Sequence, residues 1–296
     1  MKLMRGVSAV VAVQLASAAA WAQGQLYGIR SNGDVLTIDR AAGAAAFVGN
    51  SGFGCNAASH DGAGAILTMD SPFQIVTVNA ATGAGAVLAT LSNAGVVGYG
   101  PRGLAVDSTG AIWVAMSQAA TTGIDILARV NVSAGGYTLV GPTGVTDIQG
   151  LAFDANDNLF ALGIQSGGRL LSVNKTTGAA TVIGGGAFGG DDQAIEFDDA
   201  GALFAARDNL LGVNAATGAA TVIGALGFTD VRGLAFIPES GCYPDCNTSG
   251  NLTVADFGCF QGKYVLGDLY ADCNQSGTLT VADFGCFQGQ YVIGCP

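Results

Sequence analysis

An internal repeat between residues 25 and 237 constrains the fold of this chain more than any other feature. An Asp or Asn that precedes a short turn, in most copies a Thr-Gly turn, recurs at Asp39, Asn79, Asn131, Asn174 and Asn214. The spacings are therefore 40, 52, 43 and 40 residues. A period of this length, divided into short strands by Gly-rich turns, is typical of a propeller blade of four strands.

A second recurring phrase supports the same interpretation. It consists of a short apolar strand that ends in Asp, a turn, and another apolar strand. Its copies are Gly103–Asp107 with Ala111–Ala115, Gly150–Asp154 with Asn158–Leu162, Ala194–Asp198 with Ala202–Ala205, and a degenerate copy from Ala57 through Asp61 to Leu67. The strands are rich in β-branched and aromatic residues with a period of two. The sequence therefore predicts a mainly β fold for this region, since no stretch of it has helical periodicity.

The repeat predicts five blades and a closed ring. The region opens on the second strand of a blade, Gln25–Ile29, and it closes on an isolated first strand, Gly233–Phe236. If these two segments pair, no sheet edge is left exposed. A six-bladed ring, with an unrecognised blade around residues 84–125, is the alternative; a two-sheet sandwich fits poorly because the repeat is too regular.

These repeated units, of the form Leu-Tyr-x-Ile-Asp-x-x-Thr-Gly, resemble those of secreted bacterial propellers that are loosely quinoprotein-like or NHL-like. The resemblance covers residues 25–237 and implies the architecture. It does not imply one function, because such scaffolds serve lyases, hydrolases, lectins and interaction platforms.

The propeller region has few candidate catalytic residues. His60 is the single histidine, and it takes a position that Val106, Phe153 and Phe197 occupy in other copies, which indicates a core position more than a base. No Gly-x-Ser-x-Gly elbow, glycine-rich phosphate loop or basic stripe is present. The sequence therefore predicts that the chain is not an enzyme, with no catalytic residues and no organic cofactor.

Glu196 is the most unusual residue of the region, because the other copies carry alanine at its position. A carboxylate on an innermost strand could face the central channel and bind a ligand or cation, or it could reach solvent at the mouth of the ring. The pairs Asp191-Asp192 and Asp198-Asp199 bracket this strand. Loop aspartates usually form solvated turns, and a weak metal site is the alternative.

The first residues are typical of a signal peptide. Lys2 and Arg5 precede an apolar run, and Ala20-Trp21-Ala22 provides a small-x-small cleavage pattern. We therefore expect residues 1–22 to be a signal peptide, 23–237 the propeller, 238–242 a linker and 243–296 a C-terminal module, with no membrane span in the mature protein. The net charge of −11 becomes −13 without Lys2 and Arg5, which excludes nucleic-acid binding through phosphate contacts.

The C-terminal module contains two twelve-residue loops with calcium-ligand spacing, offset by 27 residues. Calcium takes six to eight oxygen ligands on a tight loop, with Gly at position 6. Gly250 and Gly277 fill that position. The predicted Ca²⁺ ligands of the first loop are Asp245, Asn247, Ser249, Asn251 (through its backbone carbonyl) and Asp256. Those of the second loop are Asp272, Asn274, Ser276, Thr278 (through its backbone carbonyl) and Asp283.

Each loop leads into a helix whose aromatic residues share one face. They lie at 257, 260 and 264 in the first copy, and at 284, 287 and 291 in the second. A loop with an exiting helix, duplicated, resembles a type I dockerin, in a Cys-rich variant with two EF-hand-like loops. The resemblance covers residues 243–295 and implies Ca²⁺ binding and docking to a cohesin-like or other extracellular protein through loop positions 10 and 11: Val254, Ala255, Val281 and Ala282. The same residues could instead pack the core of the module itself.

Six of the seven cysteines crowd the module, which in an oxidising compartment suggests disulfides. One possible arrangement clasps the two ends through Cys242 and Cys295 and pairs the other four by the internal two-fold, although six cysteines allow fifteen connectivities. Cys55 stands apart and is expected to be buried and inert.

Taken together, the sequence predicts a secreted, extracellular or cell-surface propeller that is anchored or docked to a protein partner through its calcium-binding module. The alternatives are an extracellular propeller enzyme, for example one active on a polysaccharide, delivered by that module, or a tail that acts as a sorting signal.

Overall fold

The computed structural model describes residues 24–294 except 62–63, 71–72, 95, 119–122, 165–167, 186–187, 189–190, 239–243, 248–251 and 275–277. The expected signal peptide, Cys242 and Cys295 lie outside the described residues, as do the predicted ligands Ser249, Asn251 and Ser276. The described part of the chain forms two units, a propeller that ends before residue 241 and a C-terminal module. Each unit is treated by itself below.

The propeller consists of five antiparallel sheets of four strands, so the five-bladed prediction is confirmed and the six-bladed alternative is wrong. The first blade contains β20 (Val231–Ile237), β1 (Gln25–Arg30), β2 (Asp34–Ile38) and β3 (Ala45–Asn50); the second contains β4 (Ala57–His60), β5 (Ile66–Asp70), β6 (Gln74–Val78) and β7 (Gly85–Thr90). The third contains β8 (Tyr99–Val106), β9 (Ile112–Gln118), β10 (Ile126–Asn131) and β11 (Gly136–Pro142); the fourth contains β12 (Ile148–Phe153), β13 (Leu159–Gly163), β14 (Arg169–Val173) and β15 (Ala180–Val182). The fifth contains β16 (Ala194–Phe197), β17 (Leu203–Ala206), β18 (Asn209–Val213) and β19 (Ala220–Ala225).

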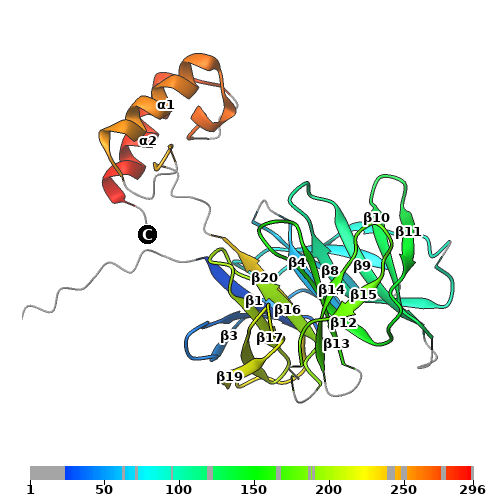
Figure 1. Ribbon diagram of the computed structural model, residues 1–296. Coiled ribbons are helices and arrows are strands. Elements are labelled where there is room, and N and C mark those ends of the chain that lie inside the picture. The colour runs from blue at the N-terminus through cyan, green and yellow to red at the C-terminus, as the bar shows by residue number, and fades with distance from the viewer. Residues whose placement is uncertain are drawn as a thin grey trace, which may run out of the picture. The chain divides into compact units, whose positions relative to one another are not determined.

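The ring closes in the first blade, which is built from both ends of the propeller sequence. Strand β20 pairs with β1 in antiparallel register, with Leu234 opposite Gly28. Figure 1 shows these two strands, β1 in blue and β20 in yellow, side by side. The predicted pairing of the isolated first strand with the opening segment is therefore confirmed.

Five hydrophobic clusters hold the ring, one at each interface between neighbouring blades. The cluster between the second and third blades, for example, joins Met69 and Ile75 to Leu104 and Val114. The other four clusters join the remaining neighbours in the same way. Each sheet is thus buried on both faces, which explains why apolar residues do not simply alternate with polar ones in the inner strands.

The Asp or Asn that marks each repeat stabilises the turn that follows it. The Oδ1 atom of Asn174, for example, accepts hydrogen bonds from the backbone N–H groups of Thr176 and Thr177 at 2.8 and 3.0 Å. The same pattern is present after Asp39, Asn79 and Asn214. These contacts are those of an Asx turn, as the repeat predicted.

The axis of the ring is closed by small residues where the inner strands meet. A Cβ atom added to Gly233 of β20 would lie 2.4 Å from the Cβ of Ala58 of β4. One added to Gly103 of β8 would lie 3.0 Å from the backbone of Gly150 of β12. These contacts divide the axis into two mouths. We call the upper mouth the end at which the five inner strands begin, and the lower mouth the end at which they finish.

The C-terminal module contains α1 (Val254–Leu266), a short 3-10 turn, η1 (Leu269–Ala271), and α2 (Val281–Ile293). Each α-helix begins with a capping box, formed by Thr253 with Asp256 and by Thr280 with Asp283. The predicted aromatic faces pack against each other, and the rings of Phe260 and Phe287 stack with centroids 4.2 Å apart. No helix of the described residues is long and apolar enough to cross a membrane.

One disulfide joins each loop to the helix that follows it: Cys246 to Cys259 in the first copy and Cys273 to Cys286 in the second. This arrangement follows the internal two-fold, as expected for these four cysteines. The disulfides are compatible with an oxidising, extracellular environment. Cys55 is buried, as predicted, and burial raises the pKa of its thiol to about 12, so the thiol is inert.

Candidate functional site

Glu196 lies on the axis of the propeller. It belongs to β16, and its Oε2 lies 3.4 Å from the Ser59 hydroxyl of β4. The blades of β4 and β16 are not neighbours, because β20 packs between these two strands, so this contact crosses the axis. The equivalent residues of the other inner strands are Ala105, Ala152 and Ala235, all fully buried. Three alanines thus leave the space that the Glu196 carboxyl group fills.

The carboxyl group of Glu196 is buried and has two partners. The side chain is 3% exposed, and Oε1 accepts a hydrogen bond from the backbone N–H of Phe197 at 3.1 Å. Burial raises the pKa of Glu196 to about 8, and the two hydrogen bonds offset this only in part. The carboxyl group is therefore protonated at neutral pH. The interpretation in which Glu196 reaches solvent at the mouth is wrong; the interpretation in which it faces the channel is confirmed.

A pocket of about 560 Å³ opens at the lower mouth, and Glu196 lines it. Its apolar wall comes from the residue that follows the Glu196 layer in each inner strand: Val106, Phe153, Phe197 and Phe236. His60 occupies the equivalent position in β4 and also lines the pocket. Burial lowers the pKa of His60, which favours its neutral form. His60 is thus a substituted core position, as predicted, but one that faces a cavity.

Carboxylates surround this pocket. No Lys or Arg lines it among the described residues, whereas six aspartates do: Asp61, Asp107, Asp154, Asp157, Asp198 and Asp199. Three of them also stabilise the turns that follow the inner strands, because Asp107, Asp154 and Asp198 accept hydrogen bonds from backbone N–H groups of those turns. Arg40 pairs with Asp198 and lies 4.9 Å above the Phe236 ring. Lys175 lies 5.3 Å above the Phe153 ring. The six carboxylates outnumber these two cations, so the pocket carries a negative potential.

The two aspartate pairs that bracket β16 do not form one acidic cluster. Asp191 and Asp192 precede the strand and lie toward the upper mouth, whereas Asp198 and Asp199 follow it and line the lower pocket. Asp192 is 9% exposed, and burial raises its pKa to about 6, so the prediction that it is a solvated turn residue is wrong. No cluster of metal-ligand side chains is present among the described residues. The strand between the pairs separates residues that are close in sequence.

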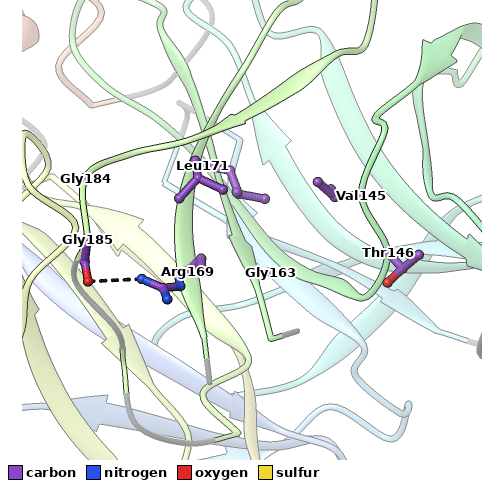
Figure 2. A pocket seen from close by; sticks show the side chains of 8 residues that line it. Val145, Thr146, Gly163, Arg169, Leu171, Gly184 and Gly185 are labelled. Carbon is purple, nitrogen blue, oxygen red and sulfur yellow. Dashed lines mark hydrogen bonds between the residues drawn. The ribbon is translucent and has the colours of Figure 1, made fainter. Parts of the chain in front are cut away.

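A second pocket of about 570 Å³ lies beside the fourth blade, away from the axis. Figure 2 shows Arg169, from β14, at its wall, with Nη1 donating to the Gly185 carbonyl at 3.0 Å. Val145, Leu171 and Val182 supply its apolar lining. No carboxylate, histidine or cysteine lines it among the described residues, so it lacks the groups needed for acid–base chemistry.

The sequence interpretation missed a ring of polar side chains at the upper mouth. A polar residue stands directly before the small residue of each inner-strand phrase: Arg102, Gln149 and Arg232 lie within β8, β12 and β20, and Asn56 and Gln193 directly precede β4 and β16. We call this set the polar ring. The repeat itself contained the signal, because the residue before each Gly-Leu-Ala or Ala-Ile-Glu phrase is polar in every copy.

In the C-terminal module the two calcium loops have the same local geometry where the structure describes them. The Asp256 carboxylate accepts hydrogen bonds from the backbone N–H groups of Thr253 and Asn247 at 2.7 and 3.3 Å. Asp283 accepts the corresponding bonds from Thr280 and Asn274 at 2.7 and 3.3 Å. Both carboxylates are fully buried, and in each case these backbone hydrogen bonds help to lower the carboxyl pKa against the cost of burial.

The first loop also brings two predicted ligands together. Asp245 and Asp256 share a side-chain hydrogen bond, so two carboxyl groups at loop positions 1 and 12 lie in direct contact. Neighbouring carboxylates are stabilised by a cation between them, and hard oxygen ligands are those that Ca²⁺ prefers. The described part of the first loop thus places two of the predicted ligands next to each other, while Ser249 and Asn251 lie outside the described residues.

The residues at loop positions 10 and 11 face solvent. Val254 and Val281 are 83% and 82% exposed, and Ala255 and Ala282 are also exposed. The alternative in which they pack the core of the module is therefore wrong. The core consists instead of the two aromatic faces, with Cys246 and Ala271.

No protein-family model matches the chain, and no curated protein sequence matches it. The fold is similar to solved propellers. One is titled as a nidogen/laminin complex, with 13% identity, a TM-score of 0.48, and coverage of 73% of this chain and 98% of that chain. Another is titled as a putative gluconolactonase, with 13% identity, a TM-score of 0.48, and coverage of 74% and 83%. A third is titled as a luciferin-regenerating enzyme, with 8% identity, a TM-score of 0.44, and coverage of 72% and 79%.

The prediction that the chain is not an enzyme is corrected by these findings, because two of the similar propellers are titled as enzymes. The prediction rested on the lack of a catalytic motif in the sequence. The fold nevertheless gathers Glu196 and His60, which are 136 residues apart, at one pocket. Residues that meet at a pocket from separate blades leave no local motif in the sequence. At this level of similarity, the likeness shows the propeller fold alone.

Proposed function

We propose that this chain is an exported propeller protein that binds a small organic cation in its lower pocket. The observation that carries the proposal is the buried Glu196 carboxyl group at the wall of a cavity lined by three phenylalanines and six aspartates. Negative potential concentrates cations at the mouth, and the faces of aromatic rings attract them further. The cavity volume suits a small molecule rather than a bare metal ion.

Binding of a cation is linked to the protonation of Glu196. A positive ligand beside the carboxyl group favours its ionised form and so lowers its pKa from about 8. Affinity should therefore rise with pH from about 6 to 8. The other titratable side chains at the pocket are six aspartates and His60, and burial lowers the pKa of His60.

Calorimetric titration with benzylamine and choline, against uncharged benzyl alcohol, tests this proposal. We expect binding of the amines that strengthens with pH in the wild type and loses its pH dependence in Glu196→Gln. Asp199→Asn, at an aspartate of the rim that is half exposed, is the matched control and should keep the pH dependence. Equal affinity for benzyl alcohol, or no binding at millimolar ligand, would contradict the proposal.

Acid catalysis is the second candidate for the same pocket. A carboxyl group that stays protonated at neutral pH can donate a proton to a bound substrate, as would be needed in an enzyme active on an extracellular polymer. Glu196→Gln distinguishes this role from binding, because the amide keeps the shape of the acid but has no proton to transfer. Turnover that survives this substitution would exclude the catalytic role.

We propose further that the C-terminal module binds Ca²⁺ and attaches the propeller to an extracellular protein, in the manner of a dockerin with its cohesin-like partner. The contact of Asp245 with Asp256 supports the metal site, and the exposed Val254 and Val281 support docking. Calcium bound at the loops would fix their ends to the helices. A tail that acts as a sorting signal remains the rival, and mass spectrometry of the native protein would reveal it as a missing module.

Calcium titration of the full chain is the direct test. We expect two sites in the wild type, and one site in each of Asp245→Ala and Asp272→Ala, since each variant lacks the carboxylate at position 1. Asp268→Asn, at an exposed acid outside both loops, should keep both sites. No heat of binding at millimolar calcium would show that the ligand assignment is wrong.

Export is proposed from residues 1–22, and Edman degradation or mass spectrometry of the secreted protein tests it. An N-terminus near Gln23 is the expected result.

A further inference from the structure

The pocket beside the fourth blade lies apart from the lower pocket and shares no described residue with it. Its volume of about 570 Å³ is in the range of sites that bind small molecules. Val145 and Leu171, two of its lining residues, also take part in the hydrophobic packing between the third and fourth blades. The pocket therefore lies at the seam of these blades, where a seam is the interface between two neighbouring blades.

Val145 stands where two other seams have a phenylalanine. In the first, third and fifth blades the chain leaves the outer strand through the same turn, in which a backbone N–H donates to the residue directly before the third strand of the blade. The donors, at 2.9, 2.8 and 3.1 Å, are Ser51, Thr143 and Leu226. Two positions further along, the chain carries Phe53, Val145 and Phe228. The two phenylalanines pack against the hydrophobic clusters of their seams, so the smaller valine leaves space at the seam of the third and fourth blades.

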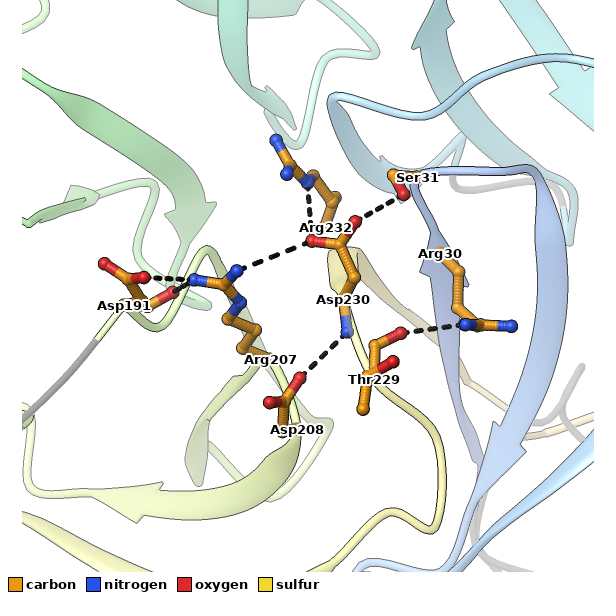
Figure 3. A network of polar contacts seen from close by, with 8 residues as sticks. All are labelled: Arg30, Ser31, Asp191, Arg207, Asp208, Thr229, Asp230 and Arg232. Carbon is orange, nitrogen blue, oxygen red and sulfur yellow. Dashed lines mark hydrogen bonds and ion pairs between the residues drawn. The ribbon is translucent and has the colours of Figure 1, made fainter.

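Gly163, the last residue of β13, leaves further space at the same seam. Its equivalent in the first blade is Arg30, the last residue of β1, because each of the two pairs with the first residue of the inner strand of its blade. Figure 3 shows Arg30 donating from Nε to the Thr229 carbonyl, at 2.7 Å. The guanidinium also lies 5.9 Å from the centre of the Phe228 ring. An arginine and a phenylalanine thus occupy, in the first blade, the space that Gly163 and Val145 leave in the fourth.

Arg169 gives the pocket a positive charge. It is the first residue of β14, and the first residue of the equivalent strand in the first blade is Asp34, which forms an ion pair with Arg30 at 2.7 Å. The hydrogen bond from Arg169 Nη1 to the Gly185 carbonyl holds the guanidinium at the wall of the pocket (Figure 2). A guanidinium has five N–H donors in a planar fork that matches a carboxylate. Because no carboxylate lines the pocket among the described residues, its charge is opposite to that of the acidic chain as a whole.

The two missing side chains and the guanidinium together select the ligand. An aromatic ring can replace the one that this seam lacks and can pack against the apolar wall of the pocket. A cation would be repelled by Arg169, and an anion without an apolar body would leave that wall uncovered. We infer that the pocket beside the fourth blade binds a small aromatic carboxylate, with its ring against Val145 and Leu171 and its carboxylate on Arg169. The site departs from the repeat, and such departures are expected where a fold carries a function.

Titration of the mature chain with 3-phenylpropionate, by calorimetry or ligand-observed NMR, tests this inference. Uncharged 3-phenylpropanamide and propionate, which has no ring, should each bind at least tenfold more weakly. Arg169→Gln removes the charge, and Val145→Phe restores the ring of the other seams; each should weaken phenylpropionate binding at least tenfold, and Val145→Phe should not lower the melting temperature. Arg129→Gln, at an exposed arginine of β10, and Val222→Phe, at a valine of β19 that is 60% exposed, are the matched controls and should keep full affinity.

Three results would overturn the inference. They are no binding of phenylpropionate at ten millimolar, equal affinity for the uncharged amide, and full affinity in Arg169→Gln or in Val145→Phe. Binding that survives both substitutions but is lost in Glu196→Gln would assign the anion to the lower pocket and would also overturn it. If Val145→Phe does not fold, Arg169→Gln and the comparison of the three ligands still decide. The amines proposed for the lower pocket carry the opposite charge and are tested with other variants, so failure of one proposal does not affect the other.

Discussion

The buried carboxyl group of Glu196 should make the propeller less stable as the pH rises. In the unfolded chain its pKa has the ordinary value of 4.5, and in the folded protein burial raises it to about 8. Between these values the unfolded state releases a proton that the folded state keeps. The free energy of unfolding is therefore unaffected by Glu196 below pH 4.5, falls as the pH rises toward 8, and then levels off.

The difference between the two pKa values sets the size of the effect. At about 1.4 kcal/mol per pKa unit, the full loss is about 5 kcal/mol above pH 8 and about 3 kcal/mol at pH 7. Glu196→Gln should abolish it. In the wild type Glu196 accepts hydrogen bonds from the N–H of Phe197 and from the Ser59 hydroxyl; the glutamine oxygen can accept from Phe197, and its amide group stays within reach of Ser59. We therefore expect the variant to equal the wild type near pH 4.5 and to be more stable at neutral pH.

Urea unfolding of the mature chain between pH 4.5 and 9 measures this difference. Trp113 is the single tryptophan of residues 23–296 and lies 6% exposed in the propeller, so its fluorescence reports this unit and not the C-terminal module. Asp199→Asn is the control for removal of a charge and should leave the pH dependence in place. Parallel curves for wild type and Glu196→Gln would refute the burial argument.

Three further substitutions test the packing. Gly233→Ala should lower the free energy of unfolding of the propeller by about 1–3 kcal/mol, because the added Cβ would lie 2.4 Å from the Cβ of Ala58. Gly136→Ala is the control: its added Cβ meets nothing within 4 Å, so it should leave the melting temperature, measured by calorimetry, unchanged. Phe260→Ala should destabilise the C-terminal module by about 3–5 kcal/mol, measured by loss of helical circular dichroism, because the ring is fully buried. Thr253→Ala removes a capping hydroxyl and should cost about 1 kcal/mol by the same measure; an effect as large as that of Phe260→Ala would show that packing does not dominate.

Much of the fold could be predicted because each blade repeats the same local physics. The Asp or Asn before each turn bonds the turn itself, so its spacing reports the blade length directly. The unpaired strand at Gly233–Phe236 had one available partner, and this predicted the closure. In the module, the aromatic spacing predicted both helices and the face through which they pack.

The functional surfaces were harder to predict, because they depend on contacts between blades. The sequence places Asp192 and Asp198 six residues apart, but it does not show that β16 carries them to opposite mouths. It shows that Glu196 replaces alanine, but its burial depends on Ser59, 137 residues away. Within three of the blades, β-bulges at Arg102, Gln149 and Arg232 interrupt the strand pairing, and the sequence shows the polar residues but not the bulges.

The pairing of β20 with β1 has a consequence for the way the protein is made. A chain that emerges from its N-terminus presents β1 first, and the strand that completes its sheet arrives about 200 residues later. Until then β1 has an unpaired edge, which can recruit strands from other chains. A chain cut short before residue 231 never covers this edge. The unpaired edge of β1 therefore marks a chain that is incomplete.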